Sequence, residues 1–257
     1  MKKLKNTELK KNSFDILPAG LILFLLVLWQ LIAPATDIPE YILPTPVRII
    51  EALIKDWNLI FSHALVTFSE ALVGFLLAVL FGIFSGVIMG YYEPVRRAFY
   101  PVFVISQTIP TIVLAPLFAI WFGFGLMPKI ILVVLVCFFP IAVTFTEGLV
   151  ETDRSMDELL KVMGAGKWKS FCVLRIPQAI PSLFSGLKIA ATYSIMAAVI
   201  SEWVGAKMGL GIFMTRAMSS FRTALLFADI LVIVILSLAV YKLIEIFEKI
   251  IKLKINF

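Results

Sequence analysis

The sequence predicts an all-α integral membrane protein with about six transmembrane helices. Of its 257 residues, 61% are hydrophobic and only 16% are charged, whereas soluble domains contain about 45–50% apolar and about 25% charged residues. The apolar residues form long runs, and short segments with Lys and Arg separate them. The chain therefore divides into a basic N-terminus at residues 1–15, expected in the cytoplasm, and one transmembrane domain at residues 16–257.

The first predicted helix runs from Ile16 to Ala33 and follows a lysine-rich segment. It is too long for the apolar core of a cleaved signal peptide and lacks a convincing cleavage site, so we expect it to be retained. From Pro34 to Trp57 the sequence predicts an extended piece broken by prolines. A short amphipathic helix after Pro46 would then lie along the outer membrane surface.

Five further spans are predicted at Leu65–Tyr91, Phe99–Phe122, Ile130–Gly148, Ser182–Val204 and Leu225–Phe247. The second span contains glycines that allow helices to approach closely in lipid: Gly74, Gly82, Gly86 and Gly90. Between the fifth and sixth spans, residues 205–222 form an outer segment in which we expect a partial re-entrant helix.

The third span is interrupted by Gln107-Thr108-Ile109-Pro110 and by Pro116. A polar pair before a proline at membrane depth either frees backbone groups beside a cavity or kinks a packed helix. Both interpretations stay open at this stage.

The distribution of basic residues predicts the orientation. With six spans and an N-terminus inside, the termini and the basic segments around Arg96, Arg97 and residues 150–181 fall in the cytoplasm. Only six bases fall outside: Arg48, Lys55, Lys129, Lys207, Arg216 and Arg222. This bias agrees with the positive-inside rule and explains the net charge of +6 better than nucleic-acid binding does.

The polar and basic interval from Asp157 to Pro181 is an extended island of charge between two apolar runs. Asp157 to Met163 predicts a short amphipathic helix with Leu159, Leu160 and Met163 on one side. Gly164 would end it, because glycine adopts positive φ angles. A second short helix, Lys167 to Leu174, would be prevented from running on by Pro177. We call this predicted helix-turn-helix the elbow; from these residues alone, a loop held by phospholipid headgroups is an equal alternative.

The same interval resembles the cytoplasmic coupling loop of ABC importer permeases. Glu158, Gly164 and the Leu174-Arg175-Ile176-Pro177 stretch stand at the spacing of the family's EAA signature, although Leu159 and Leu160 replace the two alanines. The stretch LPTPVRIIEAL, which begins at Leu43, resembles the nitrate, sulfonate and taurine branch.

The resemblance implies a MetI-like permease core that works as a dimer, here expected to be a homodimer. It also implies ABC ATPase subunits that bind the coupling loop, and an extracytoplasmic binding protein that delivers substrate. The residues it assigns to ATPase coupling are Glu158, Leu159, Leu160, Gly164, Leu174, Ile176 and Pro177.

The sequence contains no catalytic motif. The stretch Gly164-Ala165-Gly166-Lys167 lacks the earlier glycine and the Ser or Thr of a phosphate-binding loop. We therefore expect no cofactor in this chain, with ATP and Mg bound by the partner ATPase. His63 has no His or Cys companion, so a solvated or interfacial position is expected rather than a metal site.

Polar residues within the spans are candidates to line the substrate pathway: Gln107, Thr108, Thr192, Tyr193, Ser194 and Glu202, with Met196 beside them. Each polar side chain would alternatively bond a neighbouring helix. Glu202 either shapes an outer gate, faces the substrate donor, or lies at the interface beside Trp203. For Glu70, Glu147 and Asp229 near span ends, we expect contact with water or with a neighbouring base.

For the substrate, the stretch SEWVGAKMGLGIFM, which begins at Ser201, resembles the thiamine-precursor members of the branch and favours a hydroxymethylpyrimidine-type compound. Nitrate, sulfonate or taurine is the alternative. An ion-driven secondary transporter would require inverted repeats and midplane carboxylates, and a membrane scaffold would leave the elbow unexplained.

Overall fold

The computed structural model describes residues 16–36 and 38–255, so the predicted basic N-terminus, residues 1–15, lies outside the described part. This part is helical throughout, with eleven α-helices and one π turn. The elements are α1 (Ile16–Ala35), α2 (Pro46–Lys55), α3 (Trp57–Tyr91), α4 (Glu93–Ser106), α5 (Thr111–Phe122), α6 (Leu126–Val150), α7 (Arg154–Val162), α8 (Lys167–Ser170), η1 (Phe171–Arg175), α9 (Ile176–Glu202), α10 (Leu210–Ser219) and α11 (Thr223–Ile255).

Five helices of the described chain are long and apolar enough to cross a membrane, and the pair α4–α5 makes a sixth when it is counted as one span. The five are α1, α3, α6, α11 and the continuous helix Lys167–Glu202. The predicted number of about six is thereby confirmed. Helices α4 and α5 meet at an angle of 99°, and the break falls on the polar pair and proline at residues 107–110.

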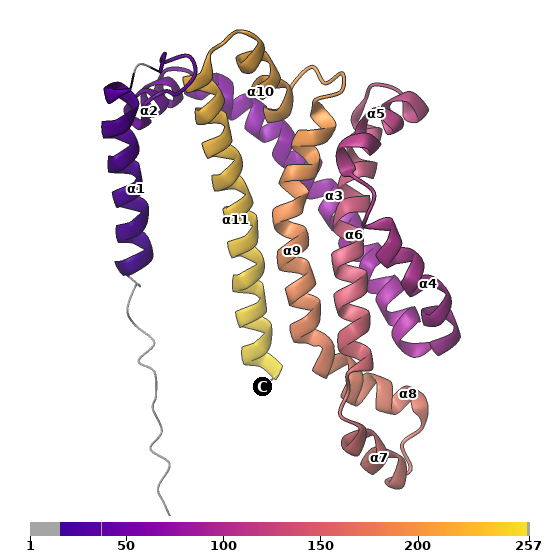
Figure 1. The fold of residues 1–257 in the computed structure, drawn as a ribbon. Coiled ribbons are helices and arrows are strands. Elements are labelled where there is room, and N and C mark those ends of the chain that lie inside the picture. Colours follow the sequence, from indigo (N-terminus) through magenta and orange to yellow (C-terminus); the bar gives the residue numbers. More distant parts are fainter. Residues whose placement is uncertain (1–15, 37, 256–257) are drawn as a thin grey trace, which may run out of the picture.

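The core lies where α3, α6 and α9 pack side by side (Figure 1). The predicted role of the α3 glycines is confirmed, because a Cβ atom on any of them would overlap an α6 side chain. At Gly74 it would lie 2.5 Å from Cβ of Val133, and at Gly82 2.8 Å from Cγ2 of Ile141. Small residues of α9, among them Ala190 and Ala198, are likewise fully buried. Since lipid gives helices no hydrophobic reason to associate, close backbone contact holds this trio together.

Helix α1 lies at the edge of the bundle (Figure 1) and exposes most of its apolar side chains. Its attachments are few. The Trp29 ring lies 5.6 Å from the ring of Phe227, and Oε1 of Gln30 accepts a hydrogen bond from the backbone N–H of Val47. An apolar helix with so little protein contact is suited to a lipid environment.

The two ends of the bundle differ. Helices α7 and α8 and the end of α11 lie at one end, toward which the start of α1 points, and α2 and α10 lie at the other (Figure 1). We call these the elbow end and the far end. An even number of spans, such as the predicted six, requires the two ends of the chain to lie on the same side, and this arrangement agrees with that requirement.

The structure lengthens most of the predicted spans by several residues and corrects one predicted break. Helix α3 begins at Trp57 rather than at Leu65. Within this extension His63 is buried, whereas Asn58 is exposed. Pro177 does not end the helix before it. Instead the π turn η1 widens the helix just before Pro177, with the N–H of Ile176 donating to Phe171 O five residues earlier. A wider turn accommodates the proline ring, so the helix continues.

Candidate functional site

The first arm of the elbow, α7, has well-defined ends. Asp153 caps its N-terminus, and the side chain accepts a hydrogen bond from the N–H of Ser155 at 2.9 Å. At the other end Gly164 has a φ angle of +82°. The N–H of Gly164 donates to Lys161 O and the N–H of Ala165 to Leu160 O, both at 2.9 Å. These two bonds form a Schellman motif, which glycine in the left-handed region permits. The predicted turn at Gly164 is confirmed.

Asp157 joins the two arms of the elbow. Its carboxylate accepts a short hydrogen bond from the Ser170 hydroxyl and forms ion pairs with Lys161 at 2.9 Å and Arg175 at 3.3 Å. The Ser170 hydroxyl, followed by Lys161, lowers the pKa of Asp157 to about 2. The carboxylate is therefore ionised at physiological pH, and the elbow behaves as one rigid unit rather than as two separate helices.

Aromatic side chains attach the elbow to the end of α3. The ring of Tyr91 lies 5.5 Å from that of Trp168 and 5.2 Å from that of Phe171. The Lys167 ammonium lies 4.8 Å from the centre of the Tyr91 ring, a distance at which a cation is attracted to the ring face. These contacts therefore transmit a displacement of the elbow directly to α3.

The elbow exposes an apolar surface. Val162 is 87% exposed and Met163 73%, and other large apolar side chains on the same unit are also exposed: Met156, Leu159 and Trp168. The predicted coupling residues divide between surface and support: Glu158, Leu159 and Gly164 are exposed, Leu160, Ile176 and Pro177 are half-buried, and Leu174 is buried.

A hollow of about 320 Å³ lies at the break between α4 and α5. Four of the predicted pathway residues line it: Gln107, Thr108, Tyr193 and Met196. The interruption thus bends the span by 99° and also borders a hollow, so both expected features are present. None of the described residues that line the hollow is Asp, Glu, Lys, Arg or His.

The other predicted pathway residues on α9 do not line this hollow. Ser194 is buried and its hydroxyl donates to Ala191 O at 2.8 Å. The Thr192 hydroxyl donates to Ile189 O at 2.8 Å. Both side chains thus satisfy their hydrogen bonds within their own helix.

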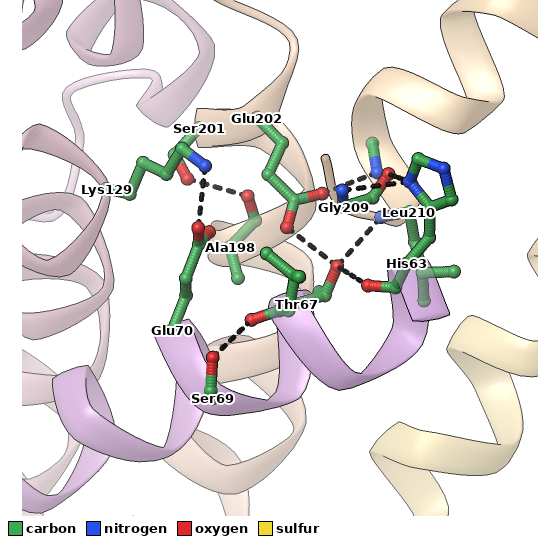
Figure 2. A network of polar contacts seen from close by, with 12 residues as sticks. His63, Thr67, Ser69, Glu70, Lys129, Ala198, Ser201, Glu202, Gly209 and Leu210 are labelled. Atoms are coloured by element: carbon green, nitrogen blue, oxygen red, sulfur yellow. Dashed lines mark hydrogen bonds and ion pairs between the residues drawn. The ribbon is translucent and has the colours of Figure 1, made fainter. Parts of the chain in front are cut away.

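Glu202 lies in a buried polar network at the far end (Figure 2) and has no exposed surface. Its Oε1 accepts a hydrogen bond from the Thr67 hydroxyl at 2.7 Å, and its Oε2 accepts one from the N–H of Gly211 at 2.6 Å. The Thr67 hydroxyl oxygen in turn accepts a hydrogen bond from the N–H of Leu210 at 2.8 Å. Glu202 therefore lies neither at the interface nor on the outer surface. It links the start of α10 to α3, and the covering α10 segment separates its side chain from water.

His63 belongs to the same network, so the predicted solvated or interfacial position is wrong. Its Nδ1 lies 2.8 Å from the carbonyl oxygen of Gly209 and 3.0 Å from the amide nitrogen. Gly209 has a φ angle of +126°, and a Cβ there would lie 2.2 Å from Cδ of Glu202. Only glycine lets the chain approach so closely, and the α10 segment that results covers His63.

The carboxylates of Glu70, Glu147 and Asp229 were expected to contact water or a neighbouring base, and two of the three do not contradict this. Glu70 is buried and forms an ion pair with Lys129 at 2.6 Å, and the exposed Glu147 accepts a hydrogen bond from the Tyr100 hydroxyl. Asp229 contradicts the expectation, because it is buried and neither oxygen has a partner among the described residues. It lies on the face of α11 that carries the core residues Leu225, Ala228 and Val232.

Sequence reasoning missed Asp157, Thr67 and Lys129 as site residues. Each acts with partners remote in sequence, such as Ser170 for Asp157 and Glu70 for Lys129, so no local pattern marks them. Among the described residues, no group of three or more His, Cys, Asp or Glu side chains is placed to hold a metal ion.

Known proteins are similar to this chain in sequence and in fold. Residues 78–255 match the family described as the binding-protein-dependent transport system inner membrane component. The chain is 38% identical to the formylaminopyrimidine transport permease protein ThiX of Halalkalibacterium halodurans, over 93% of this chain and 96% of that protein. It is 32% identical to the riboflavin transport system permease protein RibX of Chloroflexus aurantiacus, over 91% and 87%.

A more distant relative is the putative aliphatic sulfonates transport permease protein SsuC of Bacillus subtilis, at 28% identity over 84% of this chain and 78% of that protein. The fold resembles the crystal structure of an amino acid ABC transporter with histidines, with a TM-score of 0.61 and 18% identity over 77% of this chain and 96% of that one. The chain belongs to the binding-protein-dependent transport system inner membrane component family, as a multi-pass ABC importer permease of the nitrate, sulfonate, taurine and thiamine-precursor branch.

Proposed function

We propose that this permease passes a small uncharged ring compound of the hydroxymethylpyrimidine class from an extracytoplasmic binding protein to the cytoplasm. ATP and Mg would bind a separate ATPase subunit that docks on the elbow. The observation that carries this proposal is the apolar surface of the elbow, where Leu159, Val162 and Met163 project from a unit that Asp157 holds rigid. Exposed apolar surface outside the spans is a sign of a protein partner.

Docking on the elbow sets the orientation. If the ATPase is cytoplasmic, the elbow end faces the cytoplasm and so do both termini. The far end, with α2 and α10, then faces the binding protein. We further propose that two identical copies of the chain pair in the membrane.

The hollow at the helix break supports an uncharged substrate. Its polar side chains are the Gln107 amide and the hydroxyls of Ser106, Thr108, Thr111 and Tyr193. Such uncharged groups suit the ring nitrogens and exocyclic groups of a pyrimidine. A sulfonate, taurine or nitrate would leave its charge without a cationic partner there, at a substantial cost in free energy. The relative at 38% identity is named for formylaminopyrimidine transport, which agrees with this choice, whereas the sulfonate relative is less similar.

The docking proposal is tested by purifying the tagged permease in mild detergent from its host and identifying its partners by mass spectrometry. We expect an ATPase with the wild type and not with Gly164→Trp, at equal membrane levels. Gly20→Trp is the matched control, because Gly20 lies on α1 with open space around it. Absence of an ATPase from well-folded wild-type protein would overturn the docking proposal.

The substrate is tested with the complete complex in nanodiscs. We expect ATP turnover to rise when the binding protein is loaded with hydroxymethylpyrimidine and not when taurine or nitrate is offered. Stimulation by taurine or nitrate alone would refute the uncharged-substrate proposal and leave the permease assignment intact.

A further inference from the structure

The far end of the bundle is closed by a small set of hydrogen bonds that depend on one carboxylate. Helix α10 begins with Leu210 and Gly211, and their N–H groups donate to Thr67 of α3 and to Glu202 of α9 (Figure 2). The Thr67 hydroxyl completes the set by donating to Glu202. Helix α3 and the adjoining ends of α9 and α10 thus meet at a single side chain.

This set of bonds is suited to being either fully made or fully broken. Glu202 is completely buried, and within the described part of the chain no Lys or Arg forms an ion pair with it, since Lys129 pairs with Glu70. Hydrogen bonds in a buried site are strong while intact, and a half-satisfied set is costly because a buried polar group is left without a partner. Partial loosening is therefore unfavourable compared with closure or complete release.

The surroundings leave room for release. A cavity of about 330 Å³ lies beside the segment that joins α9 to α10, and Lys129, Ser201, Gly205 and Lys207 are among its lining residues. Gly205 and Gly209 at the two ends of this segment have φ angles of +71° and +126°. The segment can move into the cavity without displacing the packed core.

Both sides of this contact lead to the elbow. The helix Lys167–Glu202 runs unbroken from the elbow to Glu202. Helix α3 is also unbroken, from Thr67 near the far end to Tyr91, whose ring contacts Trp168 of the elbow. Sliding one of these helices against the other at the elbow changes the distance between Glu202 and Thr67 by a similar amount. Hydrogen bonds tolerate displacements of only a few tenths of an ångström.

From this geometry we propose that Glu202 is a positioning residue of the transport cycle, a latch that holds α10 on α3 until movement of the elbow releases it. The inference rests on the proposed function, because the movement is supplied by an ATPase bound to the elbow. By thermodynamic reciprocity, a weakened latch makes the corresponding elbow movement easier. Loss of the latch therefore raises ATP turnover in the absence of the binding protein.

The test uses the permease–ATPase complex in nanodiscs with three variants. Glu202→Gln replaces one of the two accepting oxygens by an NH2 donor. Thr67→Val removes the hydroxyl at nearly constant shape, and Thr67→Ser retains the hydroxyl as the matched control. Hydrogen–deuterium exchange is followed at residues 203–213, with and without ATP and a hydrolysis-deficient ATPase. ATP turnover without binding protein is measured separately with the active ATPase.

For the wild type and Thr67→Ser, we expect slow exchange at residues 203–213 without ATP and faster exchange with it. For Thr67→Val and Glu202→Gln, exchange is already fast without ATP, by about fivefold or more, because a buried polar group has lost its hydrogen-bond partner, and basal turnover is raised. If Glu202→Gln does not accumulate in membranes, Thr67→Val decides.

Two outcomes overturn the latch. One is exchange at residues 203–213 that does not respond to ATP in the wild-type complex. The other is faster exchange in Thr67→Val with unchanged basal turnover, which would make the network a static brace. Failure of the proposed function looks different, because then no ATPase associates with the wild type, and the latch proposal falls with it.

Discussion

Replacing Gly164 by alanine tests whether the left-handed turn determines the shape of the elbow. The φ angle of Gly164 is +82°, and a Cβ added there meets no atom within 4 Å. The cost of Gly164→Ala is therefore purely one of backbone conformation. For an L-residue in the left-handed region this cost is about 1–2 kcal/mol, which corresponds to about a 5- to 30-fold change in an equilibrium constant.

Gly166→Ala is the matched control. Gly166 lies two residues further on, has an ordinary φ of −70°, and also has open space around its Cβ position. The two variants add the same methyl group to the same turn, and only the φ angle differs. Any general effect of the substitution on lipid or solvent contacts is therefore common to both.

The measurement is hydrogen–deuterium exchange of the amides of Met163, residue 164 and Ala165, whose hydrogen bonds close the end of α7. In Gly164→Ala we expect these amides to exchange about 5- to 30-fold faster, because local opening becomes easier by the cost of the strained φ angle. In Gly166→Ala exchange should remain as in the wild type. Equal protection in both variants would refute the argument, and so would a loss confined to Gly166→Ala.

Three further predictions concern packing, charge and pH. Gly74→Ala should destabilise the protein by about 1–3 kcal/mol in detergent unfolding, because the new methyl overlaps Val133, whereas Gly20→Ala on open α1 should be neutral. Lys129→Met should cost about 3–5 kcal/mol by leaving Glu70 buried without its ion pair, and adding Glu70→Leu should restore most of the stability; failure of this rescue would contradict the pairing. Lowering the pH should leave the elbow's tryptophan fluorescence unchanged down to about pH 4 and alter it as the pH falls toward 2. The reason is that the pKa of Asp157 is lowered from 3.8 to about 2, so its contribution to stability is complete above the unfolded value and is lost as the pH falls through the folded value. A transition near pH 6 would contradict this assignment.

Features that depend on one segment were predictable. The spans follow from the length of apolar runs, and the turn at Gly164 follows from the conformational freedom of glycine. The interruption at Gln107 and Pro110 predicted the break in the third span, although the sequence left a cavity and a kink as equal alternatives. The small residues Gly74, Gly82 and Gly86 predicted close helix packing, because the absence of a side chain lets a neighbouring helix approach in lipid.

Features that depend on several segments were not predictable. The burial of Glu202 requires Thr67 from one helix and Gly211 from another, and nothing near Glu202 in the sequence indicates that such partners arrive. The same holds for His63. The sequence predicted a solvated or interfacial position for it, whereas Gly209 covers it in the structure. Asp229 is an extreme case, since its position on the apolar face of α11 buries it without a partner among the described residues.

The incorrect prediction at Pro177 bears most on function. A helix break at Pro177 would have made the elbow a hinged attachment. Movement of its apolar surface would then not have been transmitted to the rest of α9. The π turn instead keeps the helix Lys167–Glu202 continuous. Trp168 of the elbow and Glu202 therefore lie on one continuous helix, to which Asp157 of α7 is bound through Ser170. This continuity is the mechanical condition for an event at the elbow to reach the far end.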